Sequence, residues 1–353
     1  MDTYASQDLK EQPFQFTGDS FEYFKIWIVN VLLSIATLGI YSAWAKVRTN
    51  RYFYANTRVA DATLEYLADP MAILRGRLIA VGVLFLWGVL QGLVPAVQPA
   101  FVVIFMTLLP WLVVKAMTFR ARNTAYRNIR FDFSTGYGQA VKVYVGLALL
   151  SLVTFGLAYP YFAYRKSRFL VDNSAYGASP FGLQATAGSF YGIYLRALGL
   201  AVLLILMATG LTVLLGLSAH AAGRHPPPPD PAALLSGVIM LLVMMPFYLF
   251  MFTYIKTATA NVIWSNITSS GHRFRSTLRT WPMFWIYLGN ILAIIVSVGL
   301  LAPWAKVRLA RYRMDNLALL VEGDLDGFLA AQRAQVSAAG EGITDVFDID
   351  IGL

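Results

Sequence analysis

Long apolar tracts alternate along this chain with short polar segments that are rich in lysine and arginine. A helix of about 18–25 mostly apolar residues is long enough to cross a hydrocarbon core of about 30 Å. Seven tracts reach that length, and none carries an ionised group at its middle. They span about 24–45, 78–95, 100–118, 140–163, 190–218, 234–256 and 281–304. The pattern predicts an all-α fold, a polytopic helical membrane protein with about seven hydrophobic segments.

The composition agrees with a membrane protein. Hydrophobic residues make up 58% of the chain and charged residues only 13%, whereas soluble domains carry about 25% charged residues. The net charge is +9, and the basic residues stand at the ends of the apolar tracts. This position favours an anionic membrane surface over nucleic acid as the partner. We therefore expect membrane lipids, anionic ones above all, as partners and no nucleic acid.

One aromatic and basic segment occurs three times, at 39–52, 156–169 and 299–312, and the copies align without a gap. Each copy begins with glycine and an aliphatic residue and continues to an aromatic residue. Arg-x-x-Arg-aromatic follows, with an asparagine four positions later. Because many positions coincide, the sequence predicts three internal repeats. They extend over about 14–57, 131–174 and 274–317.

The repeats suggest which residues meet the membrane surface. At 100° per residue, the aromatic residue and both arginines of a copy fall on one face of a helix. An aromatic side chain at headgroup depth with guanidinium groups beyond it suits an anionic lipid interface. The predicted anion and lipid-interface residues are Trp44, Arg48, Arg51, Tyr161, Arg165, Arg168, Trp304, Arg308 and Arg311. Plain anchoring of helix ends by positive charge is the simpler alternative for the same residues. Lys46 and Lys306 align with Ala163, so this lysine is interpreted as dispensable.

The repeats raise a question of topology. If all seven tracts cross the membrane, those at 24–45 and 140–163 run in opposite directions and their basic ends lie on opposite sides. The tendency of basic residues to remain cytoplasmic argues against that arrangement. In one solution, the glycine of each copy turns the chain back and makes the tract re-entrant. In the other, the repeats are inverted, as in transporters. The sequence leaves both open.

The chain divides into a polar N-terminal segment at 1–22, a membrane domain at 23–316 and an acidic tail at 317–353. The N-terminal segment has no basic stretch followed by an apolar one, so it does not resemble a cleavable signal peptide. The tail carries seven acidic residues and one basic residue. One hypothesis is that Asp345-Val346-Phe347-Asp348-Ile349-Asp350 folds back onto the basic segments. Otherwise the tail is simply solvated.

Several kinds of chemistry find no support in the sequence. Cysteine is absent, which excludes disulfides and thiolate catalysis. His220, His225 and His272 all lie in predicted loops without carboxylates at metal-ligand spacing. We therefore expect no metal, cofactor or catalytic residue, and a protein that is not an enzyme. A transporter or channel for a small molecule is the alternative, and an enzyme that modifies lipid headgroups is a further one.

The first repeat also carries a family resemblance. The run from Thr37 to Arg48 (TLGIYSAWAKVR), followed by Arg51-Tyr52, resembles the YjgN-like family of bacterial inner-membrane proteins. The later copies and the tail around 345–348 resemble it too, although the second copy departs from the pattern at 162–164. The family is a domain of unknown function. The resemblance therefore implies a multi-pass protein of the bacterial inner membrane and supplies no catalytic residues.

Overall fold

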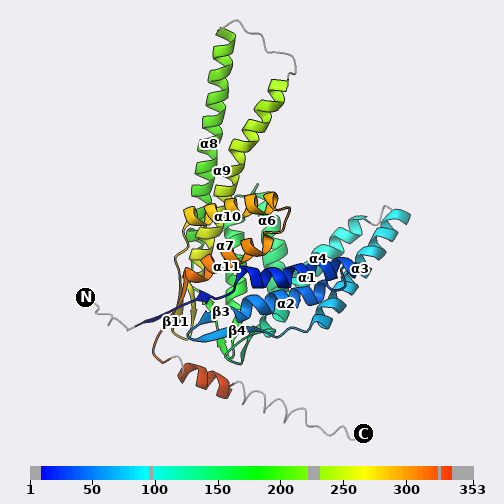
Figure 1. Ribbon diagram of the computed structural model, residues 1–353, viewed down its shortest axis with the longest axis vertical. Helices are drawn as coiled ribbons and strands as arrows, with labels where there is room; N and C mark the ends of the chain where they lie inside the picture. The colour runs from blue at the N-terminus through cyan, green and yellow to red at the C-terminus, as the bar shows by residue number, and fades with distance from the viewer. Residues whose placement is uncertain (1–8, 95–97, 222–230, 325–326, 336–353) are drawn as a thin grey trace, which may run out of the picture.

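Short antiparallel strands lie below the helices in Figure 1, and their pairing order closes them into a ring. The computed structural model describes residues 9–94, 98–221, 231–324 and 327–335, with the side chains of 208 and 211–243 left undescribed. One sheet has the order β2-β3-β4-β5-β6-β7-β8 and the other the order β1-β12-β11-β10-β9. β1 runs directly into β2 through Phe14, and β8 into β9 through Phe181. The two sheets therefore continue into one another.

The strands are two to five residues long. They are β1 (Lys10–Pro13), β2 (Gln15–Phe16), β3 (Thr57–Val59), β4 (Ala62–Tyr66), β5 (Thr124–Tyr126), β6 (Ile129–Phe133), β7 (Ser174–Tyr176), β8 (Ser179–Pro180), β9 (Gly182–Leu183), β10 (Ile267–Ser269), β11 (His272–Ser276) and β12 (Leu317–Val321). Two-residue turns join β3 to β4, β5 to β6, β7 to β8 and β10 to β11. Ala60, Asp61, Arg127, Asn128, Gly177, Ser270 and Gly271 have positive φ there, as tight hairpins require.

All helical insertions of the described chain leave the ring from the rim opposite these turns. The registers show this, because Tyr66 lies opposite Thr124 and Phe133 lies opposite Ser174. The insertions are α1 (Ser20–Ala36) with α2 (Ser42–Ala55), α3 (Pro70–Leu93) with α4 (Gln98–Arg122), α5 (Tyr137–Val141), η2 (Lys142–Gly146) and α6 (Leu147–Val153) with α7 (Tyr159–Asp172), α8 (Ala187–Ala221) with α9 (Pro231–Trp264), and α10 (Thr280–Val296) with α11 (Ala302–Asp315). Every insertion therefore starts and ends at the same rim, which we call the helical rim.

An asparagine closes each insertion in the same way. Its side chain donates to the carbonyl four residues earlier, at 2.7–2.8 Å. Its own carbonyl accepts the N–H of the residue that follows the neighbouring strand, at 2.9–3.0 Å. The pairs are Asn56 with Thr17, Asn123 with Leu67, Asn173 with Ser134, Asn266 with Gln184 and Asn316 with Thr277. These bonds satisfy carbonyls that the end of a helix leaves free, and they fix each insertion to the rim.

Three of the insertions are short helical hairpins. The outgoing helices α1 and α10 each have 17 residues, which corresponds to about 25 Å at 1.5 Å per residue. The chain turns back at Gly39, Gly156 and Gly299, whose φ values of 87–90° favour glycine. The residue before each glycine lies almost fully exposed at the tip: Leu38 at 95%, Phe155 at 98% and Val298 at 92%. Each short hairpin therefore ends in an uncovered apolar tip.

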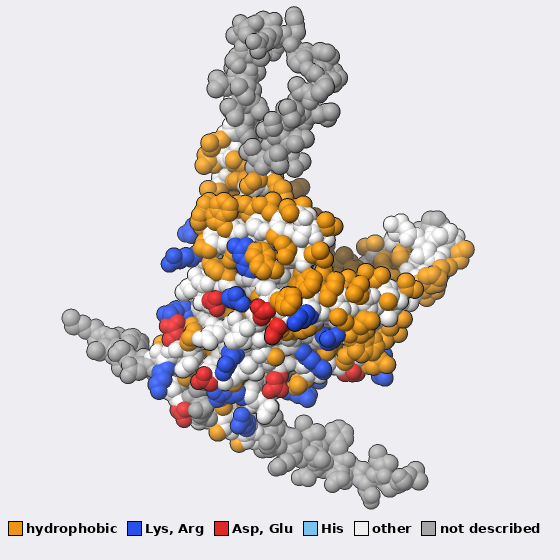
Figure 2. Space-filling view, in the orientation of Figure 1, with side chains coloured by type: hydrophobic (Ala, Val, Ile, Leu, Met, Phe, Trp, Pro, Cys, Tyr) orange, Lys and Arg blue, Asp and Glu red, His pale blue; other side chains and the backbone are white. Residues whose placement is uncertain are grey.

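Two pairs of long helices complete the set. In the described residues, three helices are long and apolar enough to cross a membrane: Pro70–Leu93, Gln98–Arg122 and Ala187–Met207. The partner of the third, α9, has 34 residues, of which the first part has undescribed side chains. In Figure 1, α8 and α9 extend upward and α3 and α4 extend to the right, with the short hairpins between them. Hydrophobic side chains cover the helices, and charged side chains gather over the strands (Figure 2).

Aromatic and aliphatic side chains fill the ring. Tyr126, Tyr176 and Ile129 are buried there, with Phe14 and Phe131 packed against them. A helix at 327–335 closes the rim that carries the turns. Its Leu329 enters the cluster with 3% exposure. Its Gln332 accepts from the Ala178 N–H at 2.9 Å and donates to the Ser179 hydroxyl at 2.8 Å.

The structure corrects part of the predicted fold. The chain is mostly helical, as predicted, but the all-α prediction missed both sheets. The tracts at 24–45, 140–163 and 281–304 are each divided by a turn into two helices with both ends at the helical rim, as the re-entrant alternative requires. His272 was expected in a loop and begins β11, where it is buried. The tail segment 345–350 lies outside the described residues.

Candidate functional site

The arginine pairs lie on the three helices that return to the helical rim, α2, α7 and α11. The second arginine of each pair binds within the fold. Arg51 donates to the carbonyls of Tyr66 and Ala68, both at 3.4 Å, and Arg311 donates to the carbonyl of Gly18 at 3.0 Å. These carbonyls lie at the end of the neighbouring strand or just after it. The second arginine thus fastens each return helix to the next part of the ring.

The second copy reaches the same result through a carboxylate. Arg168 donates to Asp172 at 2.9 Å and to the hydroxyl of Tyr164 at 2.9 Å. The hydrogen bond to Asp172 raises the pKa of Arg168 above its usual value. The other oxygen of Asp172 accepts the N–H of Leu183 at 2.8 Å, at the end of β9. Asp172 therefore provides the link that a carbonyl provides in the other two copies.

The first arginine of each pair is less involved in internal contacts. Arg48 is exposed and donates to the Tyr41 hydroxyl at 3.3 Å. The Arg308 guanidinium lies 5.1 Å from the ring centre of Trp304, close enough for a cation–π contact. Arg165 is half-buried on α7. The aromatic residue and the arginines share a helix as predicted, and their contact with lipid stays a prediction.

A second set of cations lies at one depth on the helices. Each is seven to nine residues from the end of its helix that joins the helical rim, which corresponds to about 10–14 Å. No residue with a formal charge follows them toward the far ends of the helices. We call this set the basic collar, and it consists of Lys46, Arg77, Lys115, Arg196, Lys256 and Lys306. The collar marks the level at which the surface of the helices becomes apolar.

Three collar residues meet at a groove that runs along α1, between α2, α3 and α11. We call it the α1 groove, and Lys46, Arg77 and Lys306 contribute its positive charges. Arg77 donates to the hydroxyl of Ser42 on α2. Trp27, Val31 and Ile35 line its apolar part. No carboxylate is among the described residues that line the groove.

Two side chains that line the α1 groove each hold a polar atom that is buried and has no hydrogen-bond partner in the described chain. One is the hydroxyl of Tyr23, whose side chain is fully buried. The other is Oδ1 of Asn30, which is 5% exposed and donates through Nδ2 to the carbonyl of Ala45 at 3.4 Å. Burying an unpaired polar group costs about 1–3 kcal/mol. Oδ1 of Asn290, at the aligned position of the third copy, is unpartnered in the same way.

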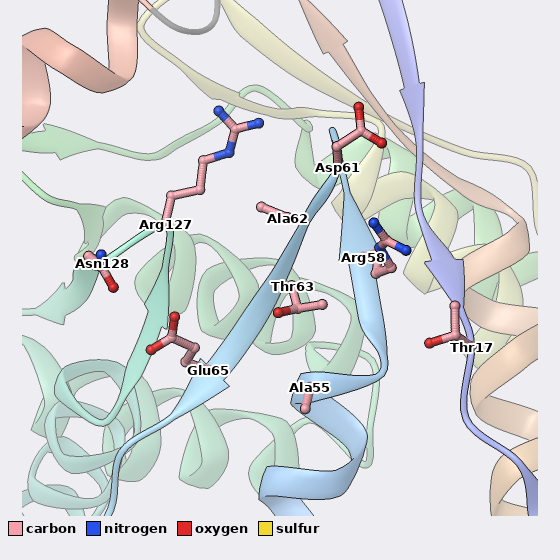
Figure 3. A pocket seen from close by; sticks show the side chains of 9 residues that line it. All are labelled: Thr17, Ala55, Arg58, Asp61, Ala62, Thr63, Glu65, Arg127 and Asn128. Carbon is pink, nitrogen blue, oxygen red and sulfur yellow. The ribbon is translucent and has the colours of Figure 1, made fainter.

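A second hollow lies on the outside of the ring, beside β3 and β4 (Figure 3). Arg58, Asp61, Glu65 and Arg127 point around it, and Thr63 lies between them. Two carboxylates and two guanidinium groups leave it without net charge. The charge gives this hollow no preference for cations or anions, unlike the α1 groove.

Sequence reasoning missed the α1 groove. None of the nine predicted interface residues lines it. Lys46 and Lys306 do line it, although their alignment with Ala163 had marked them as dispensable. A signal was available, because Asn30 and Asn290 also agree in the first and third copies while the second copy has Leu147 at that position. The residues at these positions distinguish the first and third copies from the second.

Comparison with known proteins relates the whole chain to one family. The family described as bacterial protein of unknown function (DUF898) matches residues 11–346. Inner membrane protein YjgN of Salmonella typhimurium is 26% identical over 365 residues, with 91% of each chain covered. Proteins of the same name from Escherichia coli O157:H7 and K12 are 31% and 32% identical over 130 residues, covering 36% of this chain and 32% of theirs. No solved structure matches. With the apolar helices, these relatives identify a membrane protein.

Proposed function

The chain belongs to the DUF898 family of bacterial proteins of unknown function, and we propose that it is a non-enzymatic protein of the inner membrane that engages anionic lipid at the cytoplasmic face. The ring would stand in the cytoplasm, the long helix pairs would cross the bilayer and the short hairpins would enter one leaflet. The carrying observation is that every described helical insertion starts and ends at one rim. The resemblance to proteins named as inner membrane proteins supports the location.

The shared rim removes the topological conflict among the repeats. With both ends of each insertion on one side, the three arginine pairs and the basic collar also lie on one side. The preference of lysine and arginine for the cytoplasm then assigns the ring to that compartment. Each basic residue near an anionic surface contributes about 1 kcal/mol of attraction. The collar and the outward arginines together would hold the ring against the membrane.

The depth of the short hairpins supports insertion into one leaflet. Their apolar tips extend a few residues beyond the collar, about 10 Å along the helix axis. Interfacial helices bury their apolar face to a depth of about 5–10 Å. Leu38, Phe155 and Val298 at the tips are exposed in the protein itself, so lipid is the environment that would cover them. The cations at the collar would then meet the headgroups.

A transport path through the ring receives less support. Tyr126, Tyr176 and Phe131 occupy the inside of the ring, and Leu329 closes it from the side of the turns. Among the described residues, no group of three His, Cys, Asp or Glu side chains could hold a metal ion. Membrane attachment and lipid binding remain the function that the geometry favours.

Accessibility mapping tests the topology on this chain, which lacks cysteine. Single variants Thr49→Cys, Lys166→Cys and Leu309→Cys should react with an impermeant maleimide only from the cytoplasmic side. Gln98→Cys, at the start of α4 and far from the ring, should react only from the periplasmic side. Leu38→Cys should react poorly from both. Reaction at position 166 from the side opposite to 49 and 309 would refute the shared-rim topology in the membrane.

A further inference from the structure

The α1 groove combines positive charge and an apolar wall in one place. Lys46 and Lys306 lie on the helices that flank α1, and Arg77 completes the set from α3. Because no described lining residue is acidic, the charges are not balanced within the groove. Two lysines and an arginine around one groove attract an anionic group. Phosphate groups bind this combination of donors well.

Tyr23 and Asn30 contribute a fixed part of the groove wall. Their side chains are 0% and 5% exposed. Tyr23 is held by packing, since it stacks on Tyr52 with ring centres 5.3 Å apart.

The groove also lies where a lipid headgroup would be. Its cations belong to the basic collar, beyond which the helices are apolar. Trp27, Val31 and Ile35 line the groove beside these cations. Ile35 is 69% exposed, which leaves an apolar surface on the way to the hairpin tip. A ligand with a phosphate at the collar and a hydrocarbon chain toward the tip would contact both parts.

We propose that the α1 groove is a specific site for one phosphate group of an amphiphile, with a glycerophospholipid as its chemical class. The phosphate lies between Lys46, Arg77 and Lys306, and the hydrocarbon chains lie along Trp27, Val31 and Ile35. This inference rests on the proposed function and adds a single saturable site to a general attraction.

The test measures lipid retention on the purified full chain. Native mass spectrometry in neutral detergent counts bound phosphatidylglycerol and phosphatidylcholine as each is titrated. We expect one tightly held phosphatidylglycerol. The double variant Lys46→Gln/Lys306→Gln should weaken it tenfold or more. Lys46→Arg/Lys306→Arg should retain it, and Lys115→Gln/Lys256→Gln, in the same collar but outside the groove, should leave it unchanged. If the double variant unfolds, Arg77→Gln replaces it.

Further experiments distinguish a lipid phosphate from a soluble phosphate, and the specific site from the general attraction to anionic lipid. Thermal unfolding with inorganic phosphate or glycerol phosphate should show little stabilisation, because these lack a hydrocarbon chain. Stabilisation equal to that by phosphatidylglycerol would support the phosphate site and assign it to a soluble ligand. Equal losses in the groove and collar variants would overturn the specific site and leave the general proposal intact. Flotation of the wild type on vesicles without any preference for phosphatidylglycerol over phosphatidylcholine would overturn both.

Discussion

The hairpins α1–α2 and α5–α7 occupy equivalent places on the ring but border different surroundings. Both turn at a glycine with φ near 90°, and both end in an asparagine that binds the next strand. α1 is one continuous helix beside an open cationic groove. The aligned α5 and α6 are separated by the π-helical turn η2, and α7 packs on α8 with Ala163 and Tyr164 against a buried cluster. One hairpin is open to a ligand where the other is packed with side chains.

The third hairpin, α10–α11, resembles the first in its buried asparagine. Asn290 donates to the carbonyl of Ala305 at 3.1 Å, as Asn30 does to Ala45. The turn glycine, the second arginine and the final asparagine are shared by all three copies, and each has an internal structural contact or conformation. Two components of the α1 groove, the asparagine at 30 and 290 and the lysine at 46 and 306, agree in the first and third copies only. These positions distinguish the hairpins more sharply than the shared ones do.

The largest expected effect comes from giving the first hairpin the residues of the second. Ala45→Phe/Lys46→Ala introduces the types found at Phe162 and Ala163. The ring of phenylalanine would fill the α1 groove, and one cation would be lost. We expect phosphatidylglycerol affinity to fall about tenfold or more, as measured by native mass spectrometry.

The reciprocal exchange, Phe162→Ala/Ala163→Lys, serves as the matched control. It should create no new lipid site, because Leu147 replaces the asparagine and α8 packs against α7. Acquisition of a second bound phosphatidylglycerol would show that the comparison between the hairpins is mistaken.

The buried asparagines provide the next effect. Asn290→Ala removes a hydrogen bond of 3.1 Å between α10 and α11, and we expect the free energy of unfolding to fall by about 1–2 kcal/mol. Asn30→Ala removes the longer bond of 3.4 Å and should cost less. Denaturant unfolding in detergent compares the two. A greater cost at Asn30 would contradict this ranking of the two hydrogen bonds by length.

Two aligned aspartates should respond in opposite directions. Asp172→Asn weakens the contact with Arg168, and we expect a loss of about 0.5 kcal/mol. Burial raises the pKa of Asp315 above its usual 3.8, so its charged form destabilises the native state. Asp315→Asn should therefore increase stability at neutral pH.

The pH dependence follows from the same shift. The native state holds the Asp315 proton more tightly than the unfolded state, so this contribution to stability is present at low pH and lost as the pH rises through the native pKa. Thermal midpoints between about pH 4 and pH 7 should show this loss in the wild type and not in Asp315→Asn. An identical pH profile in the variant would contradict it.

The smallest effect is the difference in stability between alanine substitutions at two aligned glycines. A Cβ at Gly146 would meet only the Val141 carbonyl at 4.0 Å, whereas one at Gly289 would approach Arg308 Nη1 at 3.0 Å. Gly146→Ala should gain up to about 1 kcal/mol from helix propensity. Gly289→Ala should gain less, because the Arg308 guanidinium must move. Equal midpoints in thermal unfolding would show that Arg308 does not lie against Gly289.

The apolar tracts and their basic ends were predictable from the sequence, because length and charge decide them within one stretch of chain. The ring was not. Its strands have two to five residues, too short for an alternating pattern to stand out, and their partners lie far away along the chain. The turn Ser270-Gly271 between Ile267 and Phe274 was the available local signal, since positive φ at both turn residues is typical of a hairpin.

Only part of the candidate site could be predicted from the sequence. The arginine pairs were found, because repetition exposes them. The meeting of Lys46, Arg77 and Lys306 depends on packing α11 and α3 beside α1, and no local pattern encodes that packing.

The closure of the ring has a consequence for biosynthesis. β1 pairs with β12, from Lys10 opposite Val321 to Pro13 opposite Ala318. β1 is the first strand to be synthesised, and it cannot form this pair until β12 has been made. Until then, β1 and each newly made strand present an unpaired edge, which invites aggregation. Insertion of the helices as they leave the ribosome would hold these edges apart from other chains. Premature termination before Leu317 would leave the edge of β1 without its partner strand.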